Sequence, residues 1–345
     1  MTATPVKAAV LGDSRPSRFR LAALQNRVLG VLAFLVVLFV FFGALAPNFA
    51  NFDNINTIAL NASILVVVAC AEATVVLTRN YDLSVGSVVA LASYVGFDVI
   101  RLHPGAGPIL AAVPMALGAL CGAVNGALVG YSGVPSVIAT LGTMSIFRGL
   151  AYVYAAGRQI DLKDLPDWVD KGVNGHVLGL AVLPLIAVVV AALAGFLLRY
   201  LPLGRQIYAV GSNPQAAAFY GLNAPSVVFR AYVLCGLLTG LAAFLFGARV
   251  TYVVPYLAQG LELTVLAAVV IGGVSVLGGS GNVVGAAIGA VAITAIDNGL
   301  VLIGASDFAR QFMQGAAIVA AVVVDAFVQR RVGEIVRAMQ RAGRR

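Results

Sequence analysis

The chain consists of long apolar stretches separated by short polar segments. A helix that crosses a bilayer needs about 20 predominantly apolar residues, because the hydrocarbon core is about 30 Å thick. The pattern therefore predicts an all-α fold, a polytopic membrane helix bundle of about ten transmembrane helices. Ten stretches approach the required length: 28–46, 59–78, 83–100, 109–130, 135–156, 178–198, 229–248, 263–279, 283–303 and 311–328.

The distribution of basic residues predicts how this bundle is oriented. The tails 1–27 and 329–345 carry several arginines and one acidic residue each, and such segments stay on the cytoplasmic side. Two cytoplasmic ends require an even number of spans. With ten spans, the basic loop 199–229 falls inside and the mixed-charge loop 157–177 falls outside. We therefore expect a transmembrane domain over 28–328 between two basic cytoplasmic tails.

Composition indicates that lipid is the main solvent. The sequence is 61% hydrophobic and 10% charged, with a mean hydropathy of +0.97, whereas soluble domains are about 25% charged. The net charge of +8 lies mostly in loops and tails, so we expect no nucleic-acid partner. The three cysteines are too few and too widely spaced to suggest disulfides or a metal site. No nucleophile–base pair is visible, so we expect no catalytic residue.

A polar cluster over 78–87 interrupts two apolar stretches. Asp82 is placed to cap the following helix, and Ser84 lies near its first turn. An ordinary capped loop between two spans explains this pattern. A broken helix whose polar ends line a solute path explains it equally well. On the second interpretation, the pathway candidates in this segment are Arg79, Asn80, Asp82 and Ser84.

Polar and ionisable side chains also lie inside the expected spans. Such groups are costly in a bilayer and face the bundle interior or a wet cavity. They serve either in a solute pathway or in hydrogen bonds between helices, and the sequence leaves both interpretations open. The candidates are Glu72, Asn125, Thr140, Thr143, Arg148, Asp297 and Asn298.

Glycines recur at every fourth position in the fourth span. This spacing places one smooth stripe along a helix, which favours close packing against another backbone. Gly281, Gly285 and Gly289 repeat the spacing later, after a glycine-rich turn at 278–281. That turn lacks the lysine of a phosphate-binding loop, so we expect no nucleotide cofactor on this chain. The packing glycines are Gly118, Gly122, Gly126 and Gly130.

The loop 199–229 contains a short predicted helix. Asn213 can cap it, Pro214 suits the first helical position, and Gly221 suits a left-handed C-terminus. A short helix with small residues on the cytoplasmic face is suited to docking in a partner's groove.

This loop resembles the Glu-Ala-Ala-x-x-x-Gly signature of importer permeases of the ATP-binding-cassette class. Gln215, Ala216 and Ala217 followed by Gly221 have its spacing, with Gln in place of Glu. The chain is most similar to the branch with the ribose, xylose and galactose permeases. The further matches are Asp82-Leu-Ser-Val-Gly-Ser, Thr140-Leu-Gly-Thr-Met, Arg148-Gly-Leu, Gly204-Arg205, Gly211-Ser-Asn-Pro and Ile271-Gly-Gly-Val-Ser. Within that branch, Arg79-Asn80 and Gly260-Leu-Glu-Leu look more like the rhamnose and autoinducer-2 permeases.

The resemblance implies a multi-pass inner-membrane subunit that imports a monosaccharide, rhamnose-like or related to autoinducer-2. It implies that the segment 213–221 couples to a separate ATPase subunit, which binds the ATP. It also implies an extracytoplasmic sugar-binding protein and a second permease subunit, identical or similar. The competing interpretation is an ion-coupled secondary transporter, for which Glu72 and Asp297 are available carboxylates. Glu72 departs from the family, in which a neutral residue is usual.

An internal repeat is hinted at by two short segments. Asp82-Leu-Ser-Val and Glu262-Leu-Thr-Val each precede an apolar stretch. Paired interruptions of this kind occur in transporters built from inverted repeats. Four loosely similar residues also arise by chance, so the sequence alone leaves the repeat open.

Overall fold

A computed structural model describes residues 27–306, 308–313, 315–316, 319–320 and 323. Within these residues, eight helices are long and apolar enough to cross a membrane. The expected all-helical membrane bundle is therefore confirmed. Both expected tails and much of the tenth expected span, 311–328, lie outside the described residues. The main helices are α2 (Arg27–Leu45), α3 (Phe52–Val76), α4 (Val85–Leu102), α5 (Ala112–Gly126), α6 (Ser136–Ala155), α8 (Val182–Tyr200), α9 (Pro202–Ser212), α11 (Ala224–Arg249), α12 (Leu261–Ile271) and α13 (Val283–Leu302).

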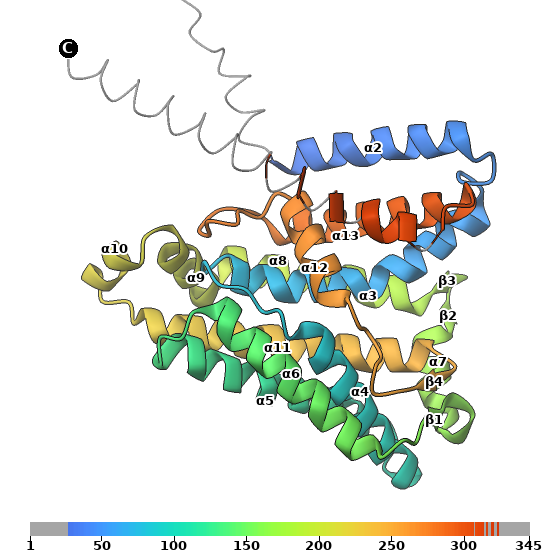
Figure 1. Ribbon diagram of the computed structural model, residues 1–345, viewed down its shortest axis with the longest axis horizontal. Helices are drawn as coiled ribbons and strands as arrows, with labels where there is room; N and C mark the ends of the chain where they lie inside the picture. The colour runs from blue at the N-terminus through green and yellow to red at the C-terminus, as the bar shows by residue number, and fades with distance from the viewer. Residues whose placement is uncertain (1–26, 307, 314, 317–318, 321–322, 324–345) are drawn as a thin grey trace, which may run out of the picture.

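Short elements connect the helices. A 3₁₀ helix η1 (Pro104–Ala111) precedes α5, and a π-helical turn η2 (Ala127–Tyr131) follows it. Two antiparallel strand pairs lie with α7 (Asp167–Asn174) at one end of the bundle, whereas α9 and α10 (Pro214–Phe219) lie at the other (Figure 1). The pairs are β1 (Ile160–Asp161) with β4 (Tyr252–Val253) and β2 (His176–Val177) with β3 (Leu180–Ala181). A further 3₁₀ turn, η3 (Leu162–Asp164), follows β1.

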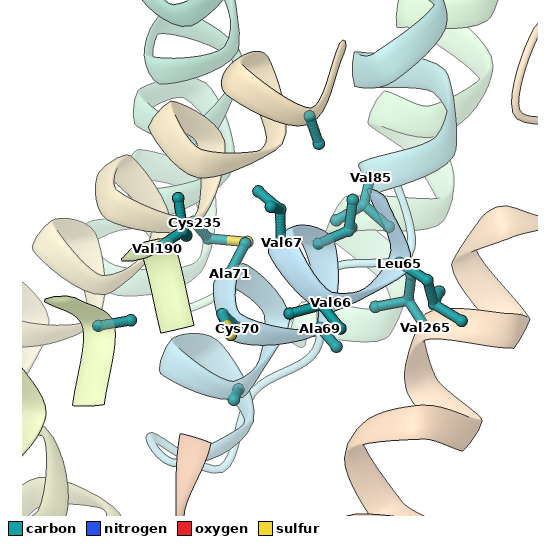
Figure 2. Close-up of a cluster of buried hydrophobic side chains, with 14 of the residues drawn as sticks. Leu65, Val66, Val67, Ala69, Cys70, Ala71, Val85, Val190, Cys235 and Val265 are labelled. Atoms are coloured by element: carbon teal, nitrogen blue, oxygen red, sulfur yellow. The ribbon is translucent and has the colours of Figure 1, made fainter. Parts of the chain in front are cut away.

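Helix α3 lies at the centre of the bundle. Its middle is apolar on every face, which is typical of a helix that is buried all round. Figure 2 shows Val67 and Cys70 of α3 among Val85 of α4, Cys235 of α11 and other side chains from neighbouring helices. Helix α2 contrasts with it, because Val40 and several neighbours are exposed. We infer that α2 is a peripheral helix that presents this face to lipid.

The glycine stripe of α5 lies directly against α11. A Cβ atom at each of the four predicted positions would meet backbone atoms of α11, including the carbonyl oxygens of Gly236 and Tyr232. Gly236 and Gly240 of α11 face α5 in return. The two backbones therefore approach too closely for any side chain to lie between them, as small residues allow in membranes.

Gly118→Leu should disrupt this contact. The new Cβ atom would lie 2.7 Å from the backbone nitrogen of Gly240, so the two helices must separate. We expect a loss of about 3 kcal/mol of stability, at the upper end of overpacking penalties. Thermal unfolding of purified protein measures the effect. Gly43→Leu in α2 is the matched control, since nothing lies within 4 Å of its Cβ position; equal melting temperatures for both variants would contradict the packing.

The expected span 263–279 was wrong in length. Helix α12 ends at Ile271 after 11 residues, about 16 Å at 1.5 Å per residue, which covers roughly half of the hydrocarbon core. Glycines end it, because Gly273, Gly278 and Gly279 adopt positive φ angles that a helix excludes. The chain from 272 to 282 is instead a compact loop, here called the glycine loop. Hydropathy treats these glycines as apolar and so overestimates the helix.

The two long helices α3 and α11 are arranged as an inverted repeat of the two halves would require. Helices α3 and α11 run in opposite directions along the bundle (Figure 1). A non-helical segment follows each, 77–84 after α3 and 250–260 after α11, and a shorter helix follows each segment. Asp82 and Glu262 lie beside the starts of these shorter helices. The arrangement agrees with the inverted-repeat interpretation of the sequence.

Candidate functional site: a polar break beside the cytoplasmic loop

The polar cluster breaks the helical path inside the bundle. After α3 the chain is non-helical, and α4 starts only at Val85. Arg79 has a φ of 70°, a left-handed conformation that ends an L-residue helix. We call residues 77–84 the break. The interpretation of this segment as a break in the helical path, rather than a surface loop, agrees with the burial of Asp82 and Ser84.

Asp82 is at the centre of a buried hydrogen-bond network. Its Oδ1 accepts from the backbone nitrogen of Ser84 at 2.9 Å and from Ser84 Oγ at 2.6 Å. Asn125 Nδ2 on α5 donates to both carboxylate oxygens at 3.2 Å. Thr143 Oγ1 on α6 donates to Asn125 Oδ1 at 2.6 Å. Asp82 does not cap α4 as expected. The N-cap residue of α4 is Ser84, whose side chain makes no capping hydrogen bond, and the Asp82 carboxylate accepts hydrogen bonds from Ser84.

Neighbouring helices satisfy the backbone of the break. Glu72 Oε1 on α3 accepts from the Asp82 nitrogen at 3.0 Å, and Thr140 Oγ1 on α6 accepts from the Leu83 nitrogen at 3.1 Å. Ser136 Oγ accepts from the Tyr81 nitrogen at 3.3 Å. Irregular backbone at membrane depth requires such partners, because no lipid group can replace them. These side chains therefore hold the break in a defined shape.

The network is closed from solvent within this chain. Glu72, Asp82, Ser84, Asn125, Thr140 and Thr143 are each at most 3% exposed. Their contact with a solute stays a prediction, and their contacts with one another support the alternative of interhelical hydrogen bonding. Glu72 Oε2 is buried and has no hydrogen-bond partner among the described residues. One acceptor site of the network is thus unused in this conformation.

Two tyrosines that sequence reasoning left aside join the break to other elements. Tyr81 donates its hydroxyl to the carbonyl of Val276 in the glycine loop at 2.6 Å. Tyr232 of α11 donates to the carbonyl of Tyr81 at 2.7 Å. Tyr232 is fully buried. The position of Tyr232 in an otherwise apolar stretch could have identified it from the sequence, because a buried tyrosine hydroxyl needs a hydrogen-bond partner.

Arg79 connects the break to the segment 199–229. Its Nε and Nη2 donate to the carbonyls of Gly211 and Ser212, both at 2.5 Å. These carbonyls lie at the end of α9, immediately before α10. Sequence reasoning grouped Arg79 with Asp82 and Ser84, but the structure directs its guanidinium to α9. Asn80 makes only local bonds, donating to the carbonyl and hydroxyl oxygens of Thr78 at 3.1 Å.

The glycine loop completes this junction. Its Gly279 nitrogen donates to the Leu77 carbonyl at 2.9 Å, and Ser212 Oγ donates to the Gly279 carbonyl at 3.2 Å. A Cβ atom at Gly211 would clash with the Leu77 carbonyl. The end of α3, the end of α9 and the glycine loop therefore meet backbone to backbone. We call this contact, centred on Arg79, the junction.

Helix α10 forms as the sequence predicts. Asn213 caps it, with Oδ1 accepting from the Ala216 nitrogen at 3.0 Å, and Pro214 is its first residue. Gly221 follows with a φ of 78°. Ala217 is buried against the bundle, and Gln215 is exposed. Phe219 and Tyr220 are 92% and 88% exposed, which sequence reasoning did not single out.

Three predicted pathway residues lie apart from the break. Arg148 Nη1 donates to the carbonyls of Pro255 and Leu257 at 3.1 and 2.7 Å, which joins α6 to the segment 250–260. Asp297 forms an ion pair with Arg310 at 3.3 Å.

Asn298 accepts from Asn54 Nδ2 at 2.9 Å. Because Asn54 lies 18 residues before Glu72 (72 − 54) on the same helix, the two are about 27 Å apart at 1.5 Å per residue. The structure therefore does not gather all the candidates into one site.

Broken segments within a membrane bundle are typical of membrane transport proteins. A family model described as branched-chain amino acid transport system / permease component matches residues 54–322. The chain belongs to this family. It is therefore a multi-pass transporter component and not an enzyme.

The similar proteins are import permeases. The chain is 36% identical to the ribose import permease protein of Escherichia coli K12 over 84% of this chain and 91% of that protein. It is 32% identical to the autoinducer 2 import system permease protein of Shigella flexneri, over 87% of each. The ribose import permease protein of Haemophilus influenzae is 33% identical over 85% of this chain and 91% of its own length. No solved structure matches.

Proposed function

We propose that this chain is the permease subunit of an ATP-binding-cassette importer in the cell (inner) membrane and moves a monosaccharide into the cytoplasm. The relatives named for ribose and autoinducer 2 support a sugar or a sugar-like signal as solute. In this proposal two permease subunits form the pathway and two ATPase subunits bind the ATP. An extracytoplasmic binding protein delivers the solute. The resemblance of Arg79-Asn80 to the rhamnose and autoinducer-2 permeases adds a rhamnose-like sugar to the candidate solutes.

Helix α10 is the observation that carries the proposal. It is fixed at both ends by Asn213 and Gly221, and it presents Phe219 and Tyr220 to solvent. Aromatic residues, phenylalanine and tyrosine among them, are enriched at the cores of protein–protein interfaces. A capped, rigid helix loses little conformational freedom on docking. We infer that α10 inserts into a groove of the ATPase, with these two rings as its anchors.

The junction connects the proposed ATPase-docking helix α10 to the break inside the bundle. A displacement of α10 moves the carbonyls of Gly211 and Ser212, which hold Arg79. Arg79 belongs to the break, whose shape depends on Asp82 and its partners. Closure of the ATPase therefore acts on the break in sequence: the ATPase moves α10, α10 moves the end of α9, and the carbonyls of α9 move Arg79. The solute gains access only if the two resulting states differ in affinity for it.

The solute is tested on a candidate sugar-binding protein identified among the genes that neighbour this one. A thermal-shift screen should include rhamnose, ribose, xylose and autoinducer 2, with leucine, isoleucine and valine as the competing class. A true ligand at 100 times its Kd adds about 2.7 kcal/mol of stability and raises the melting temperature. We expect a sugar or autoinducer 2 to do so. Stabilisation by the amino acids alone would contradict the proposed solute class.

A further inference from the structure

A pocket of about 670 Å³ opens where α8 ends and α13 begins. Arg205 and Tyr208 of α9 also line it, and α9 lies at one end of the bundle (Figure 1). None of the contacts that form the break or the junction uses its arginines. We call it the α8–α13 pocket. The lining side chains that matter here are Phe196, Arg199, Tyr200, Arg205, Tyr208 and Val284.

The outer part of the pocket is positively charged. Arg199 and Arg205 line it, and the lining includes no acidic side chain. Arg205 Nη1 donates to the Tyr200 carbonyl at 2.8 Å, which holds the guanidinium at the rim. Arg199 lies over the Tyr200 ring, 5.4 Å from its centroid. The start of the 20-residue helix α13 adds partial positive charge from its free backbone N–H groups. The pocket therefore favours an anion.

The part of the pocket along α8 and α13 is apolar. Ala192, Gly195 and Phe196 of α8 and Val284 of α13 form it, Phe196 and Val284 are 54% and 43% exposed, and both helices are candidate membrane spans. A Cβ atom at Gly195 would be in ordinary van der Waals contact with Val284 Cγ2 at 3.7 Å, so the two helices lie close together here, and the exposed apolar surface beside that contact forms a furrow. Tyr208 closes the base of the pocket by donating to the Gly281 carbonyl at 2.9 Å. An occupant must join an anionic head to an apolar chain.

We propose that the α8–α13 pocket binds an anionic phospholipid of the cytoplasmic leaflet. Its phosphate lies between Arg199 and Arg205, since a guanidinium offers paired donors to phosphate oxygens. One acyl chain follows the furrow beside Phe196 and Val284. Basic pockets between transmembrane helices on the cytoplasmic side suit such headgroups. The lipid would steady the α8–α9 corner and hence α9, whose far end carries the two carbonyls that Arg79 binds.

Native mass spectrometry of the purified permease, titrated with phosphatidylglycerol, tests this proposal. Arg199→Gln with Arg205→Gln should weaken binding about fivefold for each arginine, about twenty-five-fold together. The double lysine variant keeps both charges and should retain most of the binding. Arg230→Gln is the matched control, since Arg230 lies near the start of α11 and bonds to Ser226 and Gln206 outside the pocket. We expect it to bind like the parent protein.

Three further outcomes would overturn the proposal. Equal binding of phosphatidylcholine with the same chains would show that the charge plays no part. Displacement of the lipid by inorganic phosphate at low millimolar concentration would assign the pocket to a free anion. Unchanged lipid binding in the double glutamine variant, with loss of ATPase copurification, would make the arginines a subunit contact. Melting temperatures confirm that every compared variant is folded.

Discussion

Replacing both Phe219 and Tyr220 by serine should abolish ATP-driven uptake while the permease still folds and inserts. The two rings are almost fully exposed on α10, so their removal costs the isolated bundle little. At an interface, a buried aromatic anchor contributes roughly 2 kcal/mol or more, about thirtyfold in Kd. Loss of both should therefore separate the ATPase from the permease. Copurification of the two subunits and uptake of the labelled solute measure the effect.

Tyr256→Ser is the matched control for this pair. Tyr256 is also an exposed aromatic, but it lies in the segment 250–260, which the charge pattern places on the opposite side of the membrane. We expect it to leave ATPase binding unchanged. If the α10 variant retained both copurification and uptake, the docking role of α10 would be refuted. If both variants lost ATPase binding equally, the effect would not be local to α10.

Arg79→Gly should uncouple transport from ATP hydrolysis. Glycine adopts the positive φ of this position readily, so the backbone of the break is kept and only the side chain is lost. The variant removes two charge-assisted hydrogen bonds to α9, each worth about 1.5–3 kcal/mol. We expect uptake to fall about tenfold to a hundredfold, while the ATPase still copurifies and still hydrolyses ATP.

Arg230→Ala provides the comparison for Arg79. Arg230 also makes hydrogen bonds near the cytoplasmic face, to Ser226 on its own helix and to Gln206 on α9, but it does not contact the break. Its uptake should stay close to that of the parent protein. Unchanged uptake kinetics in Arg79→Gly would contradict the coupling role and leave Arg79 only a role in orienting the chain in the membrane. Loss of ATPase copurification in Arg79→Gly would instead indicate damage to α10 itself.

The lengths of the apolar stretches predicted the membrane-spanning helices well where apolar residues fill a whole span. They failed at α12, because glycine counts as apolar in a hydropathy sum and yet ends a helix when its φ is positive. The close packing of α5 through its glycine stripe could be predicted, since spacing alone places Gly118 and Gly122 on one face of the helix.

The candidate site was only partly predictable. Asp82, Ser84 and Asn125 lie together as a polar break suggests, but which helix faces them depends on tertiary packing. The contact of Arg79 with Gly211 joins residues 132 positions apart, and no local pattern encodes it. Asp297 and Glu72 looked alike in sequence, since both are carboxylates in apolar stretches. Only the structure separates an ion pair with Arg310 from a buried bond to the break.

In the proposed mechanism, a separate ATPase drives import through this chain. Proteoliposomes that contain the permease with its ATPase, with ATP inside and the binding protein and labelled solute outside, test it most directly. Uptake should require hydrolysable ATP and should persist when ionophores collapse every ion gradient. Uptake that follows an imposed proton or sodium gradient without ATP would contradict the claim and identify an ion-coupled secondary transporter.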